Sequence, residues 1–171
     1  MRLFRNEFSA FIGFRTLAGA VIGISLLATP AKAATDPVGI WLDHTKRGAV
    51  EIYSCGAHLC GRVVWMKNHL KSSGEPFRDR RNPKKSQRDR TICGMKMLGR
   101  LRASGSKKWS GGWIYDPERG KSFDVVIRAR GANQLKVTGY LFSPAFGKTF
   151  TWTRAPEDIG RCAPKVEAAL N

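Results

Sequence analysis

The sequence predicts a mainly β fold, a single small antiparallel β-barrel with a long basic connection after the third strand. Segments rich in β-branched and aromatic residues recur along the chain, and turn residues such as Gly, Pro and Asn separate them. No long segment has the helical period of apolar residues. A sheet of six to eight such strands has to bury its apolar face, and closure into a barrel also removes the exposed sheet edges.

The expected strands follow one another with short turns. GIWLD begins after Pro37, and AVEIYSC and LCGRVVWMK form a hairpin. The turns DPERG and GAN and the connection PAFG separate the later strands. The predicted strand segments are 39–43, 49–55, 59–67, 109–116, 121–130, 134–143 and 148–154, with a further strand or helix within 92–101. The one helix candidate near the end is the short tail at 163–170.

Residues 1–33 are typical of a secretory signal peptide. Three arginines form a basic n-region, residues 16–28 are uncharged and mostly apolar or small, and AKA ends at Ala33. The apolar run is shorter than the roughly 20 residues that a membrane span needs. We therefore expect cleavage near Ala33, a single domain over 34–171, and a periplasmic or secreted protein.

The charge balance of the chain is strongly basic. It holds 30 Lys and Arg against 13 Asp and Glu, a net charge of +17. The first 33 residues contain four basic residues and one acidic residue, which leaves a net charge of +14 on the expected mature chain. Such a charge favours anionic lipid headgroups, anionic glycans or lipopolysaccharide as partners. Nucleic acid is not an expected physiological partner outside the cytoplasm, although nonspecific binding in vitro would follow.

All four cysteines lie in the expected mature chain, where cysteines are usually oxidised. Cys55 and Cys60 flank four residues between two predicted strands, which places them across a hairpin at a separation compatible with a disulfide. A zinc site is the weaker interpretation because this stretch adds only His58, and a redox pair more typically has C-x-x-C spacing. Cys93 and Cys162 can form a second bridge, but nothing local positions them.

The segment 68–108 is long, basic and poor in strand signal. A connection of this length inside a compact domain is usually functional or mobile. Its charges can form an anion-binding patch, or they can be a solvated loop that keeps the protein soluble. The candidate basic ligand-binding residues are Arg78, Arg80, Arg81, Lys84 and Lys85. The polar residues expected near the same rim of the barrel are Asp79, Asn82, Tyr115, Asp116 and Lys121.

Catalytic patterns are not found in the sequence. His44, His58 and His69 lack the spacing of metal ligands and are interpreted as solvated turn residues. The chain contains neither G-x-S-x-G nor a nucleotide-binding glycine loop. Asp116 and Glu118 share one turn, where carboxylates more often cap backbone groups than share a proton. We therefore predict no catalytic residue, no metal and no cofactor.

Several segments occur in an order that is specific in combination. They are GIWLD, VEIYSCGAHLCGRVVWMK, DRRNP, GGWIYDPERGKSF and LKVTGYLFSPAFGKTFTWTR, over about residues 38–154. In this order they resemble the bacterial exported family catalogued as domain of unknown function 2147. The resemblance implies a small exported β-barrel domain, and it implies no activity, because the family has none assigned.

The two ends of the barrel sequence carry a second resemblance. Gly39-x-Trp41 on the first strand and Arg154 on the last are similar to the signature of lipocalin-like (calycin) barrels. In those barrels the tryptophan plugs one end and a basic side chain lies across it. A guanidinium over an indole contributes about 0.5–2 kcal/mol. The resemblance therefore implies a lipocalin-like barrel in which Arg154 stacks on Trp41.

These features predict an exported, noncatalytic binding protein of the cell envelope. Its expected ligand is a small or lipidic molecule, or an anionic envelope component such as a glycan. It is expected to be a monomer with peripheral contact to the envelope. The alternatives are an enzyme of unrecognised class with a polar rim site, and a protein-interaction module that uses the basic segment.

Overall fold

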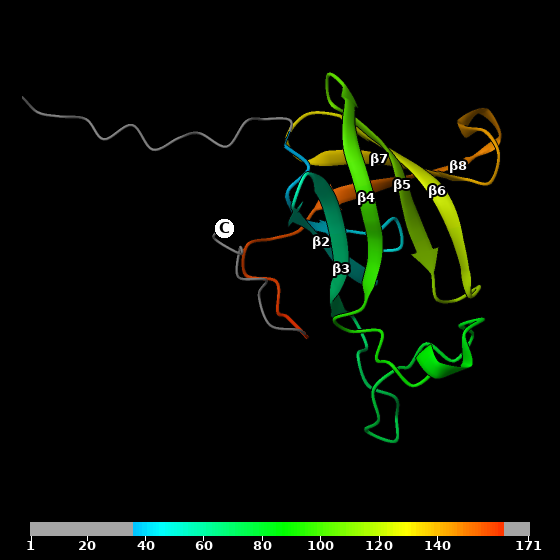
Figure 1. The fold of residues 1–171 in the computed structure, drawn as a ribbon. Coiled ribbons are helices and arrows are strands. Elements are labelled where there is room, and N and C mark those ends of the chain that lie inside the picture. Colours follow the sequence, from blue (N-terminus) through cyan, green and yellow to red (C-terminus); the bar gives the residue numbers. More distant parts are fainter. Residues whose placement is uncertain (1–35, 163–171) are drawn as a thin grey trace, which may run out of the picture. The chain divides into compact units, whose positions relative to one another are not determined.

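The computed structural model describes residues 36–162, which form a closed barrel of eight antiparallel strands (Figure 1). Each strand pairs with the next, and β1 pairs with β8 to close the sheet. The strands are β1 (Gly39–Leu42), β2 (Gly48–Cys55), β3 (His58–Met66), β4 (Lys96–Gly105), β5 (Lys108–Asp116), β6 (Lys121–Ala129), β7 (Gln134–Tyr140) and β8 (Lys148–Arg154). The predicted mainly β barrel is confirmed. The signal peptide expected at 1–33 and the helix expected at 163–170 lie outside the described residues.

The connections at the two ends of the barrel differ in length. Because successive strands alternate in direction, the β1–β2, β3–β4, β5–β6 and β7–β8 connections all leave the same end, which we call the long-loop end. The β2–β3, β4–β5 and β6–β7 turns leave the opposite end, called here the Trp41 end. Within residues 36–162, no helix has the length and apolar character of a membrane span.

Side chains on the inner face of every strand fill the barrel. Trp41 is 1% exposed, and its indole Nε1 donates a hydrogen bond to the carbonyl of Pro37 at 2.7 Å. The guanidinium carbon of Arg154 lies 4.0 Å from the centroid of the Trp41 ring, as the lipocalin-like signature implies. The buried cluster comprises Trp41, Val50, Ile52, Leu98, Leu101, Val125, Ile127, Ala129, Leu135, Val137 and Trp152.

Strand β4 is longer than the sequence predicts. We expected a segment poor in strand signal over 68–108, with a short strand or helix only within 92–101, whereas β4 spans Lys96–Gly105 and the connection after β3 ends at residue 95. Leu98 and Leu101 are both fully buried in the core, although they are three residues apart. Between them Arg100 has a φ of 59°, and the register of β3 against β4 shifts, so the strand contains a bulge. The bulge breaks the two-residue alternation by which a strand is recognised in a sequence.

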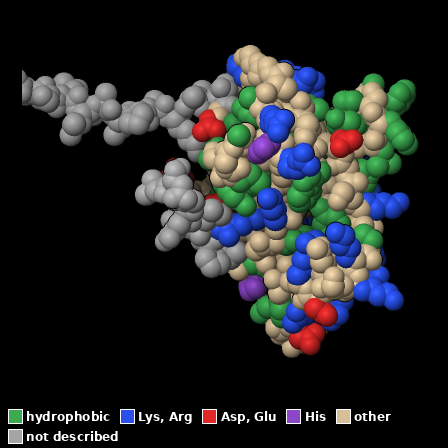
Figure 2. Space-filling view, viewed as in Figure 1, with side chains coloured by type: hydrophobic (Ala, Val, Ile, Leu, Met, Phe, Trp, Pro, Cys, Tyr) green, Lys and Arg blue, Asp and Glu red, His purple; other side chains and the backbone are tan. Residues whose placement is uncertain are grey.

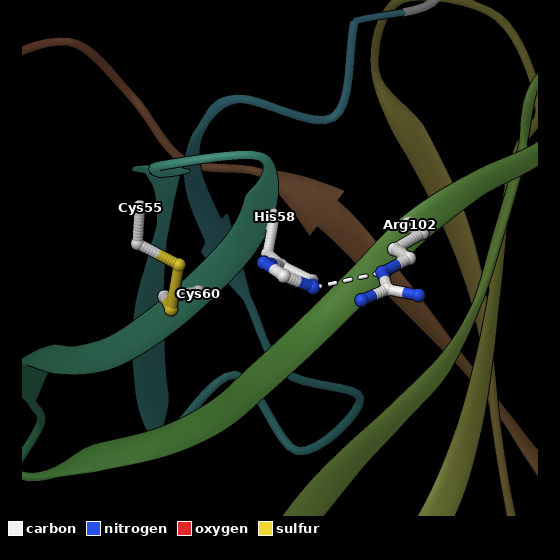
Figure 3. Close-up of a disulfide and its surroundings, with 4 residues drawn as sticks. All are labelled: Cys55, His58, Cys60 and Arg102. Carbon is white, nitrogen blue, oxygen red and sulfur yellow. Dashed lines mark hydrogen bonds between the residues drawn. A yellow bond between two sulfur atoms is a disulfide. The ribbon is translucent and has the colours of Figure 1, made fainter.

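The β2–β3 hairpin is tighter than expected. Cys55 pairs with His58, so Gly56 and Ala57 alone form the turn instead of the four residues predicted. Gly56 has a φ of 68°, a conformation that glycine adopts without strain. Cys60 pairs with Tyr53 and is therefore diagonal to Cys55. The predicted bridge is present, with Cα atoms 5.8 Å apart (Figure 3).

The chain after β8 lies against the outer face of β3. The amide of Cys162 donates to the carbonyl of Val64 at 2.8 Å, and Cys162 forms the second disulfide with Cys93. Arg161 pairs with Glu51 at 2.7 Å. Val63 pairs with the core residue Val50 and faces inward, so Val64 faces outward. Val64 is nevertheless completely buried. The tail thus covers apolar surface on the outer wall of the barrel.

Candidate functional site

A buried carboxylate attaches the β3–β4 connection to the outer wall of β5. Asp79 is fully buried. Its Oδ1 accepts a hydrogen bond from the hydroxyl of Tyr115 at 2.8 Å, and its Oδ2 accepts one from Asn82 Nδ2 at 2.7 Å. Arg90 donates to the same Oδ2 from Nε at 2.9 Å and from Nη2 at 2.7 Å. A buried carboxylate requires such partners, because unpaired burial costs several kcal/mol. We call these four residues the Asp79 network.

The protonation state of Tyr115 suits its role as a donor. Burial and the hydrogen bond to Asp79 raise the pKa of Tyr115 to about 12. The guanidinium of Arg90, 5.3 Å from the centroid of the Tyr115 ring, opposes this shift but does not cancel it. Tyr115 therefore remains protonated at neutral pH and keeps donating to the carboxylate.

A second contact fixes the connection against the β5–β6 turn. Arg81 donates from Nη1 to the carbonyl of Glu118. Gly120 in this turn has a φ of 64°, and a Cβ at this position would lie 2.0 Å from the carbonyl oxygen of Arg81. Both the backbone conformation and the close approach therefore require glycine at 120. The β3–β4 connection and the β5–β6 turn are therefore in direct contact at the long-loop end.

Between this connection and the outer wall lies a pocket of about 440 Å³, called here the outer-wall pocket. Its volume falls within the usual range of small-molecule sites. Two aromatic side chains of β5 form one wall, and three basic side chains surround it. Its lining residues are Asn82, Pro83, Lys84, Gln87, Arg90, Lys96, Trp113, Tyr115 and Ser122.

The aromatic wall follows from the pleat of β5. Ile114 packs against the core, so Trp113 and Tyr115 on either side of it face outward. Trp113 pairs with Gly99 on β4, and a Cβ at position 99 would lie 2.9 Å from the indole ring. Glycine at this position lets the indole lie closely against the outer face of β4. Trp113 is half-buried and Tyr115 is 6% exposed, so Trp113 offers most of the aromatic surface on which a planar ligand group can rest.

The charge of the pocket is positive. Arg90 is balanced by Asp79 at 2.7 Å. Lys84 and Lys96 are exposed, and in the part of the chain that the structure describes neither takes part in an ion pair. Two ammonium groups next to an aromatic wall can bind an anionic group whose planar or apolar part rests on Trp113.

Comparison with known proteins identifies the family. The model of the family described as "Uncharacterized protein conserved in bacteria (DUF2147)" matches residues 39–154. The chain belongs to this family. Among solved structures it is similar to protein HP1028 from the human pathogen Helicobacter pylori, described as belonging to the lipocalin family, with a TM-score of 0.61 and 23% identity. The similarity covers 71% of this chain and 84% of that chain, and at this identity it concerns the fold. No curated protein matches the chain.

Three of the polar residues expected near one rim of this DUF2147 barrel come together. Asp79, Asn82 and Tyr115 are joined by hydrogen bonds. Asp116 and Lys121 are opposite each other in the strand register, next to the β5–β6 turn. Neither residue lines the outer-wall pocket. The Asp116 carboxylate accepts hydrogen bonds from the amides of the following turn, so it caps that turn.

The basic candidates divide into structural and exposed side chains. Arg78 donates to the backbone carbonyl of Asp89, and Arg80 pairs with the Asp89 carboxylate at 2.6 Å. Arg81 holds the β5–β6 turn as described above. Lys84 lines the pocket, whereas Lys85, in a short 3-10 turn (Lys85–Gln87), does not. Binding of an anion by any of these five residues stays a prediction.

The sequence did not point to Lys96 as a site residue. Arg90 was expected only as one of seven basic residues in the run Arg78–Arg90, and Trp113 only as one of several strand aromatics that by default pack in the core. The signal for Trp113 was its place two residues before Tyr115 on one strand, since such residues share a face. Lys96 lies outside the run Arg78–Arg90, and only the folded connection brings it near Lys84.

The histidines take different positions. His58 accepts a hydrogen bond from Arg102 Nε at 2.8 Å, which joins β3 to β4 (Figure 3). His44 stacks on Phe150 with ring centroids 4.2 Å apart. His69 is exposed in the β3–β4 connection. Across residues 36–162, no group of three His, Cys, Asp or Glu side chains is arranged to hold a metal ion.

Proposed function

We propose that this protein is an exported, noncatalytic binding protein of the bacterial cell envelope, and that its ligand is a small anion with a planar or apolar part. The observation that carries the proposal is the outer-wall pocket, which Trp113 and Tyr115 line together with Lys84 and Lys96. Small-molecule sites commonly combine an apolar wall with a few polar groups that set orientation.

The disulfides support an exported location. No cysteine among the described residues is free, and two bridges form. Structural disulfides persist in oxidising compartments and are rare in the cytosol. Together with the signal peptide expected at 1–33, this favours the periplasm or the outside of the cell.

The Asp79 network supports binding rather than catalysis. Both carboxylate oxygens of Asp79 accept hydrogen bonds, and the side chain has no exposed surface. A general base needs access to a substrate proton. The network instead positions the β3–β4 connection, and with it Lys84, opposite the aromatic wall.

Binding of the anionic aromatic probe anilinonaphthalene sulfonate tests the pocket. We expect saturable binding to the exported protein, weakened about tenfold in Lys84→Gln/Lys96→Gln, because two surface charges contribute up to about 1 kcal/mol each. Arg128→Gln/Arg130→Gln removes the same charge at the Trp41 end and should bind as the unmodified protein does. Equal affinity in both double variants would refute the proposed pocket.

Native mass spectrometry of protein purified from the periplasm then addresses the ligand itself. A bound small molecule should appear as an added mass on the folded protein. Lys84→Gln/Lys96→Gln should lose that mass while keeping its charge-state distribution, which reports folding. Retention of the mass in this variant would place the ligand elsewhere on the molecule.

A further inference from the structure

The β7–β8 connection presents large apolar side chains to solvent. Phe142 is 96% exposed, Phe146 92% and Leu141 61%. Across residues 36–162 the other exposed large hydrophobic side chains are Leu70 and Phe77, both less exposed and both in the β3–β4 connection. Single exposed apolar residues are ordinary, whereas a group of three in six residues marks an interaction surface. We call these three side chains the apolar tip.

The backbone under the apolar tip is well built. A 3-10 turn (Pro144–Phe146) follows Ser143, whose side chain accepts a hydrogen bond from the amide of Ala145 at 3.3 Å. Gly147 lies close to β7, since a Cβ there would be 2.9 Å from the carbonyl oxygen of Gly139. The chain therefore holds the two phenylalanines outward with hydrogen bonds and packing.

A lysine lies beside the apolar tip. Lys148, two residues after Phe146, is exposed, and its ammonium lies 5.4 Å from the Phe150 ring centroid. The β5–β6 hairpin at the same end adds the exposed Lys121, whereas Arg119 pairs with Asp116 at 3.4 Å and Asp124, opposite Tyr140, is an exposed acidic residue. Figure 2 shows hydrophobic side chains at the right-hand edge where Figure 1 draws the β7–β8 connection, with Lys and Arg side chains along the same edge below them.

We propose that the apolar tip docks on an anionic lipid bilayer, with Phe142 and Phe146 inserted at the headgroup level and Lys148 near the lipid phosphates. Aromatic residues inserted beside lysines are the usual chemistry of interfacial membrane binding. The net charge of +14 on the expected mature chain attracts the same surface.

The size of the apolar tip favours a bilayer over a protein partner. Three side chains offer a few hundred Å² at most, since one aromatic buries about 150–250 Å². A stable protein interface, including a dimer of this chain, buries about 800 Å² on each partner. A bilayer accepts a narrow protruding tip without a matching surface, and lipid headgroups supply the opposite charge.

This surface is separate from the outer-wall pocket, so the two proposals fail separately. Cosedimentation of the periplasm-purified protein with phosphatidylglycerol–phosphatidylethanolamine vesicles tests the tip. We expect binding that weakens at least about tenfold in Phe142→Ser/Phe146→Ser, because two inserted rings are lost. Lys148→Gln should weaken it about fivefold, the effect of one surface cation. Phosphatidylcholine vesicles should bind less protein.

Two control variants test whether vesicle binding belongs to the apolar tip. Leu70→Ser/Phe77→Ser removes the other two exposed apolar side chains and should bind vesicles as the unmodified protein does. Lys84→Gln/Lys96→Gln should keep most of its vesicle binding. Equal sedimentation of Phe142→Ser/Phe146→Ser and the unmodified protein would overturn the proposal. So would a dimer in gel filtration that this variant dissociates, combined with no vesicle binding, since the partner would then be a second copy.

Discussion

Tyr115 on β5 and Asp79 in the β3–β4 connection are 36 residues apart in the chain and are joined by a buried hydrogen bond of 2.8 Å. The bond links the rigid barrel wall to the longest connection of the fold. Asn82 and Arg90 donate hydrogen bonds to the same carboxylate. The buried charge of Asp79 therefore fixes residues of the β3–β4 connection against β5. The lining of the outer-wall pocket depends on this arrangement.

Tyr115→Phe removes the donor and leaves Asp79 with an unsatisfied oxygen in a buried place. The expected loss is about 1–3 kcal/mol in the free energy of unfolding. The β3–β4 connection should also exchange its amide hydrogens faster, because its attachment to β5 is weakened. Denaturant unfolding and hydrogen exchange measure the two effects.

Tyr53→Phe is the matched control for this substitution. Within the described chain the Tyr53 hydroxyl takes part in no hydrogen bond, so its removal should leave both measurements almost unchanged. A Tyr115→Phe protein as stable as the Tyr53→Phe protein would mean that Asp79 does not need this donor.

The same hydrogen bond should make stability depend on alkaline pH. The pKa of Tyr115 is raised from its ordinary value of 10.0 to about 12 in the folded protein. The unfolded chain therefore releases this proton at lower pH than the folded chain does. The stabilisation is complete below about pH 10 and is lost as the pH rises through about 12.

Unfolding free energies measured across that range should show the advantage of the unmodified protein over Tyr115→Phe shrinking with pH. The comparison with the variant cancels the titration of lysines, which both proteins share. A constant difference between the two proteins through pH 12 would contradict the raised pKa.

The sequence predicted the barrel where its alternation is simple. Val125, Ile127 and Ala129 alternate along β6 and all face the core, so that strand was recognised almost to the residue. In β4 the bulge at Arg100 places Leu98 and Leu101 on one face, and the alternation disappears. A bulge depends on the register with neighbouring strands, which a sequence alone does not show.

The site was predictable in composition but not in pairing. Asp79, Asn82 and Tyr115 were expected near one rim, and they do come together, Asp79 and Asn82 from within the β3–β4 connection and Tyr115 from the end of β5. Arg90 was one of seven basic residues in Arg78–Arg90, and a run of like charges does not show which member meets a buried carboxylate. That choice depends on how the connection folds back on β5.

The two disulfides should differ in their contribution to stability. Cys93 and Cys162 are separated by 69 residues in the chain, and Cys55 and Cys60 by five. Loop-closure entropy predicts about 4 kcal/mol for the long loop and about 2 kcal/mol for the short one. Paired Cys→Ser variants of each bridge, compared by denaturant unfolding, test this order.

The Cys93→Ser/Cys162→Ser variant has a second expected effect. Without the Cys93–Cys162 bridge the tail should separate from β3 more readily. The backbone amide hydrogens around Val64 should then exchange with solvent faster. Loss of the short bridge should leave that region unchanged. The reverse order of stabilities would show that local geometry rather than loop length decides.

Arg154 should contribute to stability through packing as well as charge. Its guanidinium carbon lies 4.0 Å from the Trp41 ring centroid, and it donates to the carbonyls of Ala132, Val38 and Asp36. Burial lowers the pKa of Arg154, and the charge of Asp36 opposes that shift. Because Arg154 is partly desolvated over the indole and also donates three hydrogen bonds, Arg154→Ala should lower the free energy of unfolding by about 2–3 kcal/mol.

Arg154→Lys distinguishes the effect of the positive charge from the effect of the hydrogen bonds that the guanidinium donates. An ammonium keeps the charge over Trp41 but cannot reach three carbonyls in one plane as the guanidinium does. This variant should recover only part of the loss, while Arg130→Ala, an exposed arginine on the same end, should stay within about 0.5 kcal/mol of the unmodified protein. If Arg154→Lys were fully stable, the charge alone would be sufficient. If Arg154→Ala were fully stable, the plug at the Trp41 end would rest on the indole and the neighbouring strands, and the basic residue across it would serve some purpose other than stability.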